Sequence, residues 1–198
     1  LRQDKLDTIS ATLGIDALST SITAAIIGIL IVMLIMLVRY RMCGLVADWA
    51  LCVYIILLFL FIAVVPGIQL TLPGIAGIIL GIGMAVDANV VIFERVMEEV
   101  RLGRPMIHAV RIGFKNAMSA VLDANVTTII AAVVLLFYGT GSVQGFATTL
   151  LLGVITSMIT AIVVTRFLLT RFVRVFHEPR LFVAVKPAAD AAVEGEAK

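Results

Sequence analysis

Charge is scarce in this 198-residue sequence, of which 14% is Asp, Glu, Lys or Arg and 62% is hydrophobic. Soluble domains average about 25% charged residues and roughly 45–50% apolar ones, so the composition excludes a water-soluble globule. The net charge of +2 is too small to indicate a nucleic-acid partner. Cys43 and Cys52 form no CxxC pair, and His108 and His177 lie far apart. The sequence therefore predicts no disulfide framework, no metal site, no cofactor and no enzymatic centre.

The sequence contains several long runs of apolar residues. A helix needs about 20 apolar residues to cross the hydrocarbon core of a membrane. All five prolines lie outside the runs of this length, as expected where helix interiors must keep their backbone hydrogen bonds within lipid. The predicted fold is an all-α bundle of membrane-spanning helices. The five predicted spans cover residues 22–38, 45–65, 74–93, 117–138 and 146–165.

Basic residues are unevenly distributed between the spans. Lys and Arg occur in 39–41, 95–116 and 166–180, whereas 66–74 and 140–145 contain none. Short cytoplasmic loops carry the excess of Lys and Arg. We therefore expect the three basic segments in the cytoplasm, the N-terminus of this sequence outside and its C-terminus inside.

The expected domain organisation follows from these spans. Residues 1–20 are predicted to be an external linker, 21–170 the membrane bundle, 95–116 a cytoplasmic helical hairpin broken near Gly103, and 171–198 a cytoplasmic tail with a disordered composition from about residue 187. The bases of the hairpin fit a role in orientation and in contact with anionic membrane lipid. An external N-terminus must be carried across the membrane, so we expect an upstream part with at least one more span.

Three carboxylates lie within the apolar runs, Asp48, Asp87 and Asp123. An ionised carboxylate costs a few kcal/mol in hydrocarbon and by default marks a pathway or a paired site. Loss of solvation also favours the neutral form, which suits an acid that gains and loses a proton. Asp48 begins its run, where a helix N-terminus favours negative charge, and is interpreted as a cap or interfacial anchor.

Asp87 and Asp123 are the candidate proton-coupling residues. Each lies about 9 Å from the cytoplasmic end of its span, on antiparallel neighbours, and we expect Asp87 to be enclosed among helices. The alternative is that both carboxyl groups only hydrogen-bond between helices and hold the bundle together. Ser119, Asp123 and Thr127 follow one another at helical spacing and predict a polar stripe that avoids lipid.

Other polar and small residues are predicted around these acids. The polar lining is completed by Asn125, Thr128 and Ser157. Small residues let transmembrane helices approach closely, although such patterns are common in membrane helices. The predicted packing glycines are Gly77, Gly81, Gly83 and Gly153.

The run LPGIAGIILGIGMAVDANVVIFERVMEEVRLGR, residues 72–104, closely resembles the signature of the SecD family, membrane subunits of the bacterial SecDF accessory complex of protein translocation. The resemblance continues through residues 113–169 and includes the opening stretch 12–51. It implies membership of the resistance-nodulation-division superfamily, whose members couple inward proton flow to movement of external domains. It also implies six spans in the full-length protein and a large external domain between the first two, so that this sequence is one half-bundle of that type without its first span.

The resemblance carries functional roles onto matching positions. Asp87, in GMAVDANV, matches the proton-coupling residue of the family, and Asp123 lies in LDANVTT. The implied partners are SecF, the SecYEG channel and a preprotein bound by the missing external domain, in the bacterial inner membrane. The implied function is proton-driven assistance to protein export, without catalysis of a covalent reaction. The sequence holds no buried base, so a cation that pairs with Asp87 must come from another subunit.

Two alternatives stay open at this point. In the first, the chain is half of a proton-driven lipid or drug exporter of the same superfamily, and such an exporter would carry a second set of spans on the same chain. In the second, the chain is a membrane scaffold, and replacing Asp87 by Asn would have no functional effect.

Overall fold

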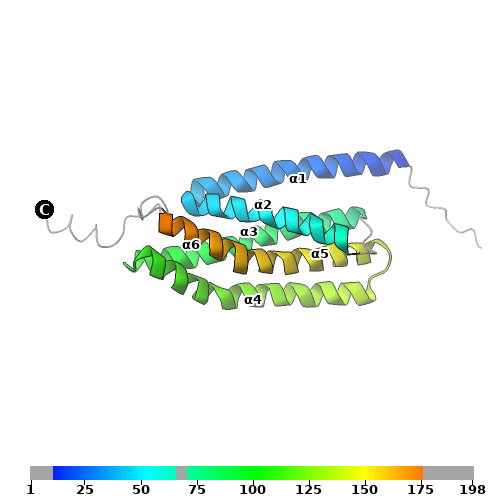
Figure 1. The fold of residues 1–198 in the computed structure, drawn as a ribbon. Helices are drawn as coiled ribbons and strands as arrows, with labels where there is room; N and C mark the ends of the chain where they lie inside the picture. The colour runs from blue at the N-terminus through cyan, green and yellow to red at the C-terminus, as the bar shows by residue number, and fades with distance from the viewer. Residues whose placement is uncertain (1–10, 66–70, 176–198) are drawn as a thin grey trace, which may run out of the picture.

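The structure is a computed structural model that describes residues 11–65 and 71–175, and its helices run side by side in alternating directions (Figure 1). Within these residues, five helical rods are long and apolar enough to cross a membrane, which confirms the predicted all-α bundle of five spans. The last rod joins α5, a π-helical segment η1 and α6. The elements are α1 (Ala11–Tyr40), α2 (Met42–Val64), α3 (Leu72–Arg101), α4 (Met106–Tyr138), α5 (Ser142–Ile159), η1 (Thr160–Thr165) and α6 (Arg166–Val175).

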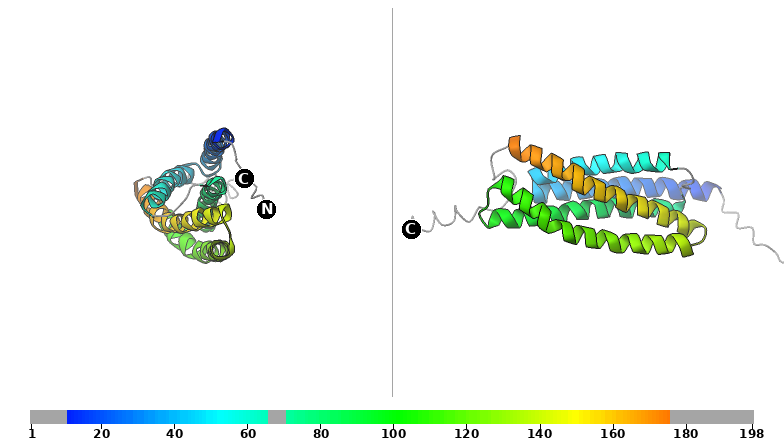
Figure 2. Two further views of the ribbon diagram at one scale, coloured as in Figure 1. Left: turned by 90° about the vertical axis from the view of Figure 1, so that its right-hand side faces the viewer. Right: turned by 60° about the horizontal axis from the view of Figure 1, so that its bottom comes forward.

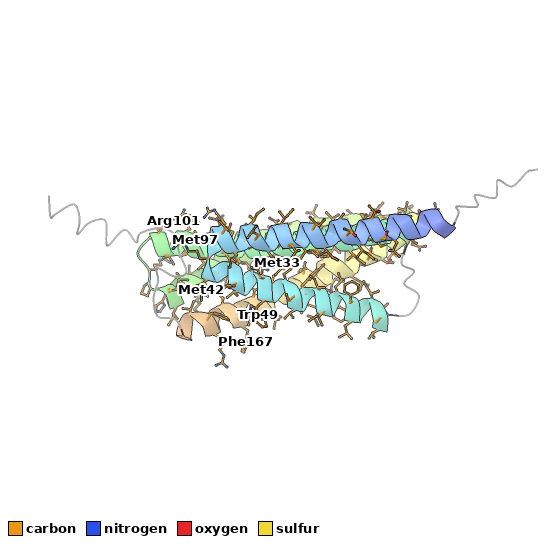
Figure 3. All side chains as sticks on the ribbon, turned by 90° about the horizontal axis from the view of Figure 1, so that it is seen from above. Met33, Met42, Trp49, Met97, Arg101 and Phe167 are labelled. Carbon is orange, nitrogen blue, oxygen red and sulfur yellow. The ribbon has the colours of Figure 1, made fainter. Side chains whose placement is uncertain are left out.

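Helix α3 packs along both α5 and α4, whereas α1 lies at one edge of the bundle and packs mainly on α2 (Figure 2). Large apolar side chains project from the free sides of α1 and α2, as Figure 3 shows for Trp49, which is 63% exposed. Apolar residues on the outside suit lipid or the apolar face of another membrane subunit. The buried core lies between α2, α3, α5 and the first half of α4, around Tyr54 and Phe93.

Local sequence accounts for the turns. The Thr71 hydroxyl accepts a hydrogen bond from the Gly74 N–H at 3.1 Å and caps α3, with Pro73 in the first turn, where its missing N–H costs nothing. Between α3 and α4, Gly103 adopts a φ of 80°, a left-handed conformation that glycine reaches without steric strain. Pro105 follows and directly precedes α4.

The helices extend past the expected segment boundaries. α1 begins at Ala11, so the second half of the expected linker 1–20 is helical, and α6 makes 171–175 of the expected tail helical. Residues 1–10, 66–70 and 176–198 lie outside the described residues. The expected hairpin 95–116 is formed by the continuous ends of α3 and α4, because a change from apolar to charged side chains such as Glu and Arg does not end a helix.

One end of the bundle carries all the Lys and Arg side chains of the described residues. We call it the basic end; it comprises the α1–α2 turn, the α3–α4 turn with the adjoining ends of both helices, and α6. Here the Tyr40 hydroxyl donates to Glu94 Oε1 at 2.9 Å, and Arg39 Nη2 lies 3.5 Å from the same oxygen. These contacts fasten the end of α1 to α3.

Candidate functional site

Asp87 lies near the middle of α3, and its side chain lines a small cavity of about 140 Å³ between α3 and α4. The cavity is lined by small and apolar side chains of both helices, and by Asn125 and Thr128 of α4. Among the described residues, Asp87 forms no hydrogen bond and no ion pair with a cation. It is a carboxyl group at the edge of a hollow between two packed helices, without a charge partner among the described residues.

The Asp87 side chain is exposed in this chain, unlike the expected enclosure. The reason is the direction of the side chain around α3. Asn89, two residues later and therefore about 200° around the helix, is buried. Since α5 and η1 pack on the Asn89 side, none of the described helices covers the outer side of Asp87.

Asp123 is also exposed and lies on α4, outside the lining of the Asp87 cavity. Its nearest polar partners belong to α4 itself. The Ser119 hydroxyl donates to Asp123 Oδ2 at 3.3 Å, and the Thr127 hydroxyl donates to the Asp123 backbone carbonyl at 3.0 Å. The polar stripe predicted from helical spacing is thus a surface stripe of α4, and the two acids do not share a cavity.

The remaining predicted lining residues divide between two places. Asn125 and Thr128 reach the cavity edge, where their side chains donate to the backbone carbonyls of Val121 at 2.7 Å and Ala124 at 3.2 Å. Ser157 is buried in α5 and donates to the Val154 carbonyl at 2.8 Å. It does not line the Asp87 cavity.

A glycine seam joins α3 to α5. A Cβ added to Gly77 would collide with the Thr149 hydroxyl, and one added to Gly81 would lie 2.7 Å from the Tyr54 hydroxyl and 3.4 Å from the Gly153 Cα. Gly153 has the reciprocal contact. Gly83 differs, because nothing lies within 4 Å of a Cβ added there. The seam holds α3 firmly against α5, and Asp87 lies about 80–120° around α3 from its glycines.

Sequence reasoning missed a buried hydrogen bond on the far side of α3 from Asp87. The Thr165 hydroxyl donates to Asn89 Oδ1 at 2.8 Å, and both residues are buried. Thr165 closes η1, and π-helical turns are rare and often occur at functional sites. The only sequence signal was an Asn two residues after the candidate Asp.

This bond is expected to tie α3 to η1 measurably. Thr165→Val removes the donor and leaves Asn89 Oδ1 unpaired, and Asn89→Ala removes the acceptor. A double-mutant cycle in the detergent-solubilised full-length protein should give a coupling of about 0.6 kcal/mol and up to about 1.7 kcal/mol, the range for hydrogen bonds between transmembrane helices. Additive effects of the two substitutions would contradict the assignment.

Sequence reasoning also missed a buried carboxylate at the basic end. Glu99 is only 7% exposed. Asn116 Nδ2 donates to its Oε1 at 3.1 Å, and Arg104 Nη1 makes an ion pair with its Oε2 at 2.8 Å. These contacts fix the α3–α4 turn, so at least one base of the hairpin has a structural role.

Comparisons with known proteins agree with this architecture. The family model described as protein export membrane protein SecD/SecF, C-terminal, matches residues 1–175. The protein translocase subunit SecD of Synechocystis sp. is 48% identical over 179 residues, which are 88% of this chain and 38% of that protein. SecD of Acidaminococcus fermentans is 54% identical over 164 residues, 82% of this chain and 39% of that protein.

Solved structures are similar as well. The crystal structure of SecDF from Thermus thermophilus, a translocon-associated membrane protein, superposes with a TM-score of 0.79 at 40% identity, covering 82% of this chain and 23% of that one. A second SecDF structure, in a super-membrane-facing form, gives a TM-score of 0.77. The chain thus spans about two fifths of the SecD relatives or less. By the extent of these matches, it belongs to the SecD/SecF family of protein export membrane proteins and corresponds to the family's C-terminal membrane part.

Proposed function

We propose that this chain is the membrane part of a protein translocase subunit that uses the proton-motive force to assist protein export across the bacterial inner membrane. The observation that carries the proposal is Asp87, an acid near the middle of a membrane-crossing helix, beside a cavity and without a cationic partner among the described residues. A membrane acid of this kind is a functional residue by default, because its desolvation is unfavourable. Such an acid can avoid the cost of a desolvated charge by binding a proton, so we infer that it binds and releases one.

A partner subunit completes the site in this proposal. An exposed carboxylate on a membrane helix is unfavourable against lipid, so the α3–α4 face needs a polar or cationic cover. The family match supports SecF as that cover, since the family model describes SecD and SecF alike and the related solved structures are of SecDF. SecF then supplies the base that pairs with ionised Asp87, and Asn125 and Thr128 provide polar contacts on the α4 side.

Protonation of Asp87 shifts the balance between two packings of the α3–α4 face against the partner. The ionised acid favours the packing that brings a cation near it, and the neutral acid releases that cation. A proton crossing a potential of 100 mV supplies about 2.3 kcal/mol, enough to bias two states that differ by that amount. The close contacts at Gly77, Gly81 and Gly153 keep α3 and α5 together, so the two helices move as one rigid body when the packing against the partner changes.

The distribution of basic residues gives the orientation of the bundle in the membrane. Because all Lys and Arg of the described residues lie toward the basic end, that end faces the cytoplasm and the start of α1 faces outward. α1 then links the bundle to an external domain that binds the preprotein, and the complex works beside the SecYEG channel. Translocon association is the property named for the solved SecDF relative.

The test is export by membrane vesicles that contain the full-length protein with Asp87→Asn, measured with and without a proton-motive force. The proposal requires loss of only the proton-dependent part. Retention of that part would contradict it.

A further inference from the structure

A groove with basic side chains runs between α4 and α6 at the basic end, on another side of the bundle from the Asp87 cavity. It consists of two adjoining open hollows of about 340 and 390 Å³ that share Arg111, Phe114 and Arg166. Lys115 lines the second hollow and lies one helical turn from Arg111 on α4. Three cations from two helices therefore converge on one groove.

No acidic side chain of the described residues lines this groove. The acids of the hairpin are engaged elsewhere, since Glu94 contacts Arg39, Glu98 contacts Arg95 and Glu99 contacts Arg104. Within the described part of the chain, none of the three groove cations forms an ion pair. The groove is thus a concentration of unbalanced positive charge, suited to an anion.

The walls between the cations are mainly apolar, with Thr170 as the one uncharged polar side chain among the residues that line them. Ile107, Val110 and Val173 line the first hollow and Met118 the second, with Phe114 shared by both. A free inorganic anion would leave this apolar surface unused. An amphiphile with an anionic head and hydrocarbon tails uses both, and the groove lies between helices long enough to cross a membrane, where lipid is the surrounding solvent.

We propose that this groove binds an anionic phospholipid, with the headgroup phosphate held by Arg111, Lys115 and Arg166 and the acyl chains lying along the apolar walls. Arginine presents paired N–H groups that match phosphate oxygens, and lysine adds a compact charge. Basic pockets between transmembrane helices are a known setting for such headgroups. The inference does not depend on the role of Asp87.

The experiment compares two triple variants of the full-length protein, purified in detergent with its partner subunits. Arg111→Gln, Lys115→Gln and Arg166→Gln together remove the groove charges. The matched control, Arg41→Gln, Arg95→Gln and Arg101→Gln, removes the same charge from exposed positions at the same end that do not line the groove. Bound phosphatidylglycerol and phosphatidylcholine are counted by native mass spectrometry during a lipid titration.

The groove variant should lose affinity for phosphatidylglycerol by about tenfold or more, and the control by less than about twofold, with little change for phosphatidylcholine. The pair Arg111→Lys and Arg166→Lys keeps the charge and should keep most of the binding. Equal losses in both triple variants would overturn the proposal in favour of general surface attraction. Displacement of the lipid by millimolar inorganic phosphate would overturn it in favour of a soluble anion. Unchanged binding in the groove variant would also overturn it, because the bound lipid would then lie elsewhere on the protein.

Discussion

Replacing Asp87 by Asn is expected to abolish the proton-driven part of preprotein export while the full-length protein still inserts and assembles. Asn has nearly the same shape as Asp and can still hydrogen-bond beside Asn125 and Thr128, but it cannot exchange a proton. Because the exposed Asp87 side chain makes no ion pair with a described cation, the substitution leaves no buried charge of this chain unpaired. The rate of translocation into energised membrane vesicles should fall to the rate seen without a proton-motive force.

Two control variants separate coupling from general damage. Glu98→Gln removes an exposed acid of the same helix that only pairs with Arg95, and should leave export unchanged. Asp123→Asn tests the second candidate, whose contacts lie within α4 and outside the Asp87 cavity. We expect Asp87→Asn to have the larger effect of the two. Full proton-driven export by Asp87→Asn would leave the membrane scaffold as the better description.

The same substitution at two glycines of α3 is expected to have opposite effects on stability. Gly77→Ala places a methyl group against the Thr149 hydroxyl and 3.0 Å from the Phe146 carbonyl oxygen. Thr149 is fully buried and donates to the Gly74 carbonyl at 2.9 Å, so it has little room to move away. Overpacking of this kind costs about 1–3 kcal/mol.

Gly83→Ala is the matched control six residues along the same helix. Nothing lies within 4 Å of a Cβ at this position, so the better helix propensity of alanine should raise stability by up to about 1 kcal/mol. Both variants are compared by thermal or denaturant unfolding of the full-length protein in detergent. A Gly77→Ala protein as stable as Gly83→Ala would mean that α3 and α5 are not closely packed.

The number of spans could be predicted from the sequence because hydropathy and proline placement act locally. Their ends could not, because Glu94 and Arg95 end an apolar run without ending α3, which continues to Arg101. Hydropathy reports the position of the membrane, whereas backbone hydrogen bonding decides where a helix stops.

The candidate site was predictable in its residues more than in its arrangement. Helical spacing placed Ser119, Asp123 and Thr127 on one stripe, and they hydrogen-bond to one another or to the local backbone, but the spacing could not show that the stripe is exposed. It could not place Asp87 relative to α5, because the direction of a side chain in the bundle depends on which neighbour packs on which face. The Asn89–Thr165 bond depends in addition on η1, whose i→i+5 hydrogen bonding departs from the 3.6-residue periodicity used for prediction.

The central claim is that Asp87 changes its protonation state in the assembled protein, and infrared difference spectroscopy of the carboxyl stretch tests it most directly. The full-length complex in lipid should show a protonated carboxyl band that appears and disappears as the pH is changed. The band should be absent in Asp87→Asn and retained in Asp123→Asn. A spectrum in which Asp87→Asn removes no titrating carboxyl band would contradict the account.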